Sequence, residues 1–95
     1  MILRTTKFKV RKEALPEVLA KFPDLKKALA QVDTMVLNYA AWNNDGEGMT
    51  MAVYNSRKEA DAALEMVGGV WQALAPFMEN PPEFTTFENA ENMRG

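Results

Sequence analysis

Hydrophobic and polar residues alternate along the first ten positions of the chain, MILRTTKFKV. Ile2, Phe8 and Val10 fall on one side of this pattern together with Arg4 and Thr6, and two lysines fall on the other. A period of two is typical of a strand with one buried face. We therefore predict a β-strand over residues 2–10.

The following segment has a helical pattern. Its apolar residues recur at spacings of three and four, which predicts an amphipathic helix over about residues 12–31. Pro23 lacks a backbone donor and clashes with the preceding turn, so we expect a kink or two short helices, 13–21 and 24–31. The apolar residues of this face are Leu15, Val18, Leu19, Phe22, Leu25 and Leu29.

Two runs rich in strand-forming residues come next, DTMVLNYAAW and MTMAVYN. The cluster NNDGEG between them holds turn residues that tolerate a positive φ. This arrangement predicts a β-hairpin that pairs residues 34–42 with residues 48–54.

A second helix is predicted after the hairpin. Ser56 and Glu59 have the spacing of a capping box, which marks a helix start. Apolar residues keep helical spacing past Gly68 and Gly69 as far as Met78, and they form two stripes. A helix that is apolar on two sides is buried on both, or it faces a cavity or a partner.

The segment ENPPEF ends this helix, and EFTTFEN, residues 83–89, predicts a fourth strand. The order β-α-β-β-α-β predicts a ferredoxin-like α+β fold, a four-stranded antiparallel sheet with the helices on one face. Apolar residues such as Leu3 and Phe87 fall on both faces of this sheet. We therefore expect the uncovered face to pack on a second copy, in a homodimer.

The length and composition narrow the class of protein. Ninety-five residues form one core, so we take residues 1–95 as a single domain. No stretch stays apolar for the roughly 18 residues that a membrane span needs, and we expect no membrane partner. The N-terminus lacks the basic and apolar regions of a secretory signal, which favours a cytoplasmic location.

The chain contains no cysteine and no histidine. Disulfides, zinc sites built on these residues, thiol nucleophiles and histidine-based triads are therefore excluded. We expect no metal site and no bound cofactor.

Charge is distributed unevenly, although the net charge is only −2. Residues 1–31 hold eight basic residues against three acidic ones, and the rest of the chain is acidic. Nucleic-acid binding favours exposed aromatic residues within a basic surface, whereas Phe8 and Phe22 both lie in apolar register. We expect no nucleic-acid partner, and two solvated faces that attract each other within or between subunits.

The stretch MTMAVYNSRKEADAAL, residues 49–64, followed by VGGVWQALAPFM, resembles the antibiotic biosynthesis monooxygenase-like domains of the dimeric α+β barrel superfamily. In that family a strand with an aromatic end leads through a short polar turn into a helix that begins S-x-x-E/A-A-D-A-A-L. The order and length of the elements are similar over the whole chain. The resemblance implies a homodimer whose two sheets close a barrel, and a pocket between helices and sheet in each subunit.

Members of this family include enzymes that oxidise polycyclic aromatic substrates with O2 and no metal or flavin, relatives that degrade haem, and many without an established activity. The haem-degrading relatives use an asparagine on the first strand, a tryptophan in the second helix and a histidine further along it. Here Thr6 and Ala63 stand at the first two positions, and there is no histidine. Haem degradation is therefore disfavoured.

The cofactor-free oxygenases use Asn, Trp, Tyr and Arg side chains to bind the substrate in a deprotonated form. The resemblance implies a monooxygenase-like protein that binds a small apolar or aromatic molecule, with cofactor-independent oxidation by O2 as its chemistry. Arg4 would stabilise an anion, and Tyr54 or Asn38 would orient it. The residues of this chain do not match that set one to one, so no catalytic residue is assigned. The candidate substrate-binding residues are Arg4, Thr6, Asn38, Tyr54 and Trp71.

Two of these residues have a structural interpretation as well. Trp71 is either a core anchor or the wall of a pocket opened by the glycine pair, and the core is favoured. Arg4 binds either an anionic ligand or a carboxylate, Glu88 or Glu83, with the ion pair favoured.

The alternative function is a noncatalytic dimeric domain, either ligand-binding or purely structural. The absence of a strong general base favours it, because the acidic residues fall mostly at predicted surface positions. Isomerase or lyase chemistry is a third hypothesis, and it needs a buried carboxylate with a raised pKa, which does not stand out here.

Overall fold

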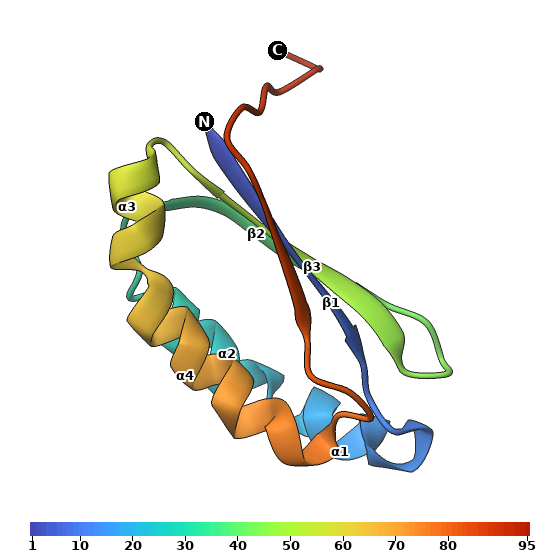
Figure 1. Ribbon diagram of the computed structural model, residues 1–95. Coiled ribbons are helices and arrows are strands. Elements are labelled where there is room, and N and C mark those ends of the chain that lie inside the picture. The colour runs from blue at the N-terminus through green and yellow to red at the C-terminus, as the bar shows by residue number, and fades with distance from the viewer.

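A computed structural model of residues 1–95 places the N-terminal strand, β1 (Ile2–Lys9), inside a four-stranded antiparallel sheet of order β2-β3-β1-β4 (Figure 1). The other strands are β2 (Met35–Trp42), β3 (Glu47–Tyr54) and β4 (Glu83–Phe87). The helices cover one face, as Figure 1 shows, so the predicted ferredoxin-like α+β fold is confirmed.

The turn between β2 and β3 depends on a glycine. Gly46 has a φ of 94°, and a Cβ there would overlap the carbonyl oxygen of Val10. The backbone N–H of Val10 in turn donates to the Gly46 carbonyl at 2.9 Å. The hairpin tip is therefore fixed against the end of β1 by a contact that only glycine fits.

The first helical segment is divided, as Pro23 predicts. It consists of a 3₁₀ turn, η1 (Lys12–Ala14), followed by α1 (Leu15–Ala20) and α2 (Phe22–Leu29). Pro23 is the second residue of α2, where a backbone N–H would have no helical partner, so its missing donor is tolerated there.

The second helical segment is also divided, which the sequence pattern does not predict. α3 (Arg57–Ala62) and α4 (Leu64–Leu74) meet at Ala63, and a 3₁₀ turn, η2 (Ala75–Phe77), follows. Ser56 caps α3 as expected, because its Oγ accepts from the Glu59 N–H at 3.2 Å. Ala63 at this junction is 4% exposed and packs in a buried cluster with Ile2 and Tyr54 of the sheet. The glycine pair lies inside α4 and does not end it, so a helix break there is excluded.

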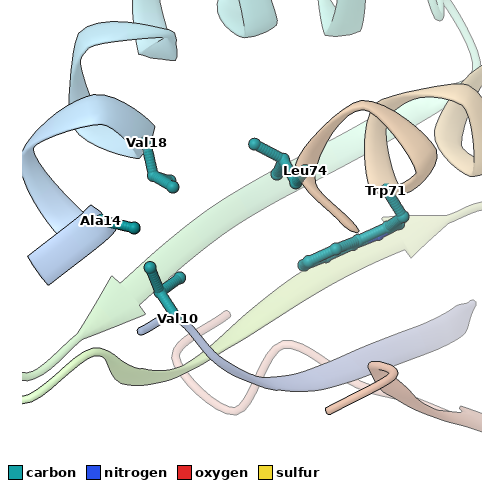
Figure 2. Close-up of a cluster of buried hydrophobic side chains, with 5 residues drawn as sticks. All are labelled: Val10, Ala14, Val18, Trp71 and Leu74. Carbon is teal, nitrogen blue, oxygen red and sulfur yellow. The ribbon is translucent and has the colours of Figure 1, made fainter. Parts of the chain in front are cut away.

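Two clusters of buried side chains join the helices to the sheet. The first combines Trp71 and Leu74 of α4 with Val10, Ala14 and Val18 (Figure 2). The second contains Ile2, Tyr54, Ala60 and Ala63. Only 12 of the 95 residues are buried, because a cavity lies in the helix–sheet interface and the opposite face of the sheet is bare. None of the helices is both long enough and apolar enough to span a membrane.

Strand pairing settles which residues face the helices. Thr6 pairs with Thr50 and Phe84, and Arg4 pairs with Ala52 and Thr86. Since side chains alternate along a strand, these rows face the same side, and on β2 they include Asn38, Ala40 and Trp42. The large apolar residues left exposed on the opposite face are Leu37, Tyr39, Met49 and Phe87.

Candidate ligand-binding site

A cavity of about 280 Å³ lies between the sheet and the helices. Its lining contains 26 residues, of which 20 are hydrophobic, drawn from all four strands and from α1, α2 and α4. Pockets for small molecules usually measure about 300 to 1,000 Å³ and are mostly apolar with a few polar groups. The volume and lining therefore fit a small, largely apolar molecule.

Four polar side chains of the sheet form a polar strip along one wall of this cavity: Arg4, Thr6, Asn38 and Thr50. Thr6 and Thr50 are cross-strand neighbours, so their side chains lie next to each other. Arg4 is two residues from Thr6 along β1, about 7 Å away, and Ala52 separates it from Asn38 in the same row. All these residues line the cavity, which thus has hydroxyl, amide and guanidinium groups on one wall.

Aromatic rings lie beside this strip, since Phe84 pairs with Thr6 and Phe8 is two residues further along β1. The Trp71 ring lies 5.7 Å from that of Phe8 and 6.2 Å from that of Phe84, the second pair nearly perpendicular at 86°. The rings of Phe22 and Trp42 meet edge to face at 5.2 Å. Such pairs hold one another in place and add to the stabilisation from burial. A flat ring would find aromatic partners here on α2, α4 and the sheet.

Trp71 is both a core residue and part of a cavity wall, the two structural roles that the sequence left open. Its side chain is only 9% exposed and belongs to the first buried cluster, yet it also lines the cavity. Gly68 lies one turn earlier on α4 and lines the cavity too, and a Cβ there would meet no atom within 4 Å. The glycine therefore leaves space in the wall beside the tryptophan.

Arg4 makes an ion pair, but its partner is Asp61, not Glu88 or Glu83. Its Nη2 donates to Asp61 Oδ1 at 2.8 Å, its Nε donates to Thr86 Oγ1 at 3.2 Å, and its Nη1 donates to the Ala60 carbonyl. The expected partner was wrong because the packing of α3 over β1 brings in a residue 57 positions away.

Asp61 has a second partner in Arg57. The Nε of Arg57 lies 3.2 Å from Asp61 Oδ1, and its Nη1 lies 3.7 Å from Glu88 Oε1. The hydrogen bond from Arg4 lowers the pKa of Asp61, with a smaller contribution from Arg57 and with desolvation opposing both. The carboxylate therefore stays ionised and balances the charge of Arg4.

Two buried residues that line the cavity carry hydroxyl groups without a partner in the chain, and neither oxygen is itself fully buried. Tyr54 is 1% exposed and Thr6 is 5% exposed, and neither side chain forms a hydrogen bond to another residue. Burial raises the pKa of Tyr54, opposed by the charge of Arg4, so its phenol is neutral at ordinary pH. Asn38 donates only to Met35 Sδ, at 3.0 Å. The cavity thus offers hydrogen bonds that the fold does not use.

Carboxylates are absent from the lining, where the charged residues are Arg4 and Lys26. No three acidic side chains gather elsewhere into a group that could hold a metal ion. Isomerase or lyase chemistry, which needs a carboxylate base in the pocket, therefore has no candidate residue.

The structure brings all five candidate residues, Arg4, Thr6, Asn38, Tyr54 and Trp71, to the same cavity. Sequence reasoning missed Thr50, Trp42 and the aromatic pair Phe8 and Phe84 as lining residues. The alternation along the third strand could have placed Thr50 beside Thr6, whereas Trp42 required knowing which face of β2 meets the helices.

A four-stranded antiparallel sheet that encloses an apolar cavity beneath helices defines the class, a ferredoxin-like α+β domain. The sequence matches no known family model, and it matches no curated protein. Solved structures nevertheless show the same arrangement. An antibiotic biosynthesis monooxygenase superposes with a TM-score of 0.79 at 12% identity, over 96% of this chain and 100% of the other.

Two Streptomyces proteins are also similar. SnoaB, a cofactor-independent oxygenase from Streptomyces nogalater, gives a TM-score of 0.77 at 16% identity, over 99% of this chain and 97% of the other. The monooxygenase from the gene ActVA-Orf6 of Streptomyces coelicolor, in complex with Nanaomycin D, gives 0.70 at 14%, over 97% and 89%. The chain therefore has the fold of the antibiotic biosynthesis monooxygenases, as the resemblance predicts.

Proposed function

We propose that this protein binds a small, mostly apolar aromatic molecule in the cavity between the sheet and the helices. The observation that carries the proposal is the apolar lining of a cavity of about 280 Å³ whose wall includes the ring of Trp71. A similar fold supports it, since the monooxygenase from the gene ActVA-Orf6 has Nanaomycin D bound as a ligand.

The aromatic rings and the neighbouring polar strip together would orient such a ligand. Rings of the ligand pack among Trp71, Phe8 and Phe84, where each Å² of buried apolar surface contributes about 25 cal/mol. A hydroxyl or carbonyl group of the ligand meets the unused hydroxyl of Tyr54 or Thr6. Part of the gain is offset by the lost freedom of the ligand, so we expect dissociation constants of about 1 to 100 μM.

Oxidation of the bound molecule by O2 without a cofactor is the reaction that we propose for the site. The likeness to SnoaB favours it, because that protein is a cofactor-independent oxygenase of the same fold. The electrons would come from the substrate itself, which must be readily oxidised. The residues of this chain would bind it, orient it through Tyr54 or Asn38, and exclude water. Noncatalytic binding is the alternative, supported by the lack of a carboxylate base in the lining.

The proposal is tested by tryptophan fluorescence during titration with polycyclic phenols and quinols, with oxygen uptake recorded in parallel. Quenching in the parent protein that is reduced in Trp71→Phe supports binding beside this residue. Trp42→Phe is the matched control, because Trp42 lines the cavity at a different position and stays present in the first variant.

Oxygen uptake separates the two functions. Uptake above the rate of the quinol alone, lost on unfolding the protein, indicates an oxygenase. Quenching without uptake indicates a binding protein. If no compound quenches either tryptophan, ligand binding in this cavity is wrong and the structural alternative holds.

A further inference from the structure

Of the two cations at the wall of the cavity, one is paired with a carboxylate of the protein and the other is exposed to solvent. Arg4 and Lys26 are the charged residues in the lining. Lys26 is exposed on α2, where water screens its ammonium group. The Arg4 side chain is only 16% exposed, so it is the charge that a bound molecule would meet.

The guanidinium group of Arg4 already has hydrogen-bond partners within the protein. Three of its five N–H groups donate to Thr86, Ala60 and Asp61, and the last of these is a carboxylate. The two remaining N–H groups can donate to a neutral oxygen. A ligand carboxylate, by contrast, would have to approach an arginine whose counter-ion is 2.8 Å away.

The ion pair between Arg4 and Asp61 belongs to a group of four charged side chains whose net charge is zero. Asp61 contacts both Arg4 and Arg57, and Arg57 contacts Glu88. Two positive and two negative groups thus compensate one another at the outer side of the cavity. The pKa of Asp61 is held down by these contacts, which keeps the compensation in place at ordinary pH.

The unused hydrogen-bonding groups in the cavity are uncharged as well. The hydroxyls of Thr6 and Tyr54 and the amide of Asn38 can each donate to, or accept from, a neutral polar group. A carboxylate in this lining would lose its hydration, which is costly in an apolar site. The one lining cation without a counter-ion in the protein is Lys26, whose exposed ammonium group is screened by water and repays little of that cost.

We infer that Asp61 determines the charge selectivity of the cavity: by neutralising Arg4 it makes the site select uncharged ligands, such as phenols and carbonyl compounds, over carboxylates of the same shape. Asp61 is a specificity-determining residue that does not itself line the cavity. The inference rests on the proposed function, because it requires that the cavity binds a ligand.

The test compares 2-naphthol with 2-naphthoate by isothermal titration calorimetry at pH 7. Both probes carry the same two rings, but the phenol is neutral because its pKa is about 10, and the carboxylic acid is ionised because its pKa is about 4. We expect 2-naphthol to bind at least about tenfold more tightly, which corresponds to about 1.4 kcal/mol.

Equal or tighter binding of 2-naphthoate overturns the inference and leaves the proposed function standing. If neither probe binds, the proposed function is wrong and the selectivity is wrong with it.

Asp61→Asn tests the role of the residue itself. The amide oxygen can still accept from Arg4, so the guanidinium stays in place while its counter-charge is removed. We expect 2-naphthoate to bind at least about fivefold more tightly to this variant and 2-naphthol to change by less than about twofold. Glu88→Gln is the control, because Glu88 contacts Arg57 and not Arg4, and it should leave both affinities within about twofold.

Unchanged binding of 2-naphthoate by a folded Asp61→Asn protein, as judged by circular dichroism, overturns the assignment to Asp61. Should the variant not fold, the wild-type comparison of the two probes still decides whether the cavity selects neutral ligands.

Discussion

The ring of Trp71 contributes to a buried cluster and to the wall of a cavity at once, so the two interpretations of this residue do not exclude each other. Phe8 and Phe84 hold the ring on its sheet side. Gly68 leaves space beside it. For the ligand that we propose, a residue fixed by the core in this way would be a rigid surface, which lowers the ordering cost of binding.

Tyr54 gives a pH-dependent prediction. Burial raises the pKa of its phenol, so above about pH 10 the unfolded chain releases this proton while the folded chain retains it. The free energy of unfolding therefore falls as the pH rises through this range. Tyr54→Phe should remove that part of the fall, and at pH 7 it should change the free energy of unfolding by less than about 1 kcal/mol, since the hydroxyl makes no hydrogen bond within the chain.

Urea denaturation at pH 7 and at about pH 11 checks this expectation. Tyr39→Phe, measured below the concentration at which the protein pairs, is the control, because this ring is 63% exposed in the single chain. Equal loss of stability in Tyr54→Phe and in the parent protein at the higher pH would contradict the burial of an unpartnered phenol.

Arg4 shows the limit of residue-level prediction. The alternation along the first strand places a guanidinium on an apolar face, which requires a partner, and this much is correct. The identity of the partner depends on how α3 lies over β1, and that placement is a result of tertiary packing. Local pattern alone therefore indicated a carboxylate near the fourth strand, Glu88 or Glu83, and did not indicate Asp61.

At the scale of elements, the sequence predicts those features that local chemistry determines. The four strands, the hairpin turn and the division at Pro23 all follow from alternation, a glycine with positive φ and a proline. The division at Ala63 and the register shift between Met35 and Leu37 could not be predicted, because neither carries a local signal. Both depend on packing against the rest of the fold.

The uncovered face of the sheet leads to a prediction about assembly. Leu37, Tyr39, Met49 and Phe87 are each more than a third exposed there, an apolar surface that a second copy would bury. We expect a homodimer at micromolar concentration in sedimentation velocity experiments. Tyr39→Asp should shift it towards the monomer, because a carboxylate at this face would lose its hydration on association.

Gln72→Asp is the matched control for the dimer, since Gln72 is exposed on α4, on the helical side of the molecule. It should leave the sedimentation coefficient unchanged. A parent protein that sediments as a monomer at these concentrations would contradict pairing through the sheet.

At the scale of the whole molecule, the cavity results from incomplete filling of the helix–sheet interface. Residues of both buried clusters belong to its lining, and Gly68 leaves part of the α4 wall open. The sequence identified five residues of its lining because alternate positions of a strand share a face. It could not give the volume, which depends on the separation of α4 from the sheet.

The central claim, that this cavity binds a small apolar molecule, is tested most directly by filling it. Gly68→Leu places a side chain into open space in the lining, whereas Gly69→Leu places the same side chain on the exposed side of the same helix. Both changes replace a helical glycine, so each protein should be at least as stable as the parent.

The measurement is the affinity of the two variants and the parent for 2-naphthol, by isothermal titration calorimetry. We predict that Gly68→Leu binds at least about twentyfold more weakly, because the side chain occupies the space that the ligand needs, and that Gly69→Leu binds as the parent does. Equal affinity of the two variants, with both folded, would contradict the claim that the ligand occupies this cavity.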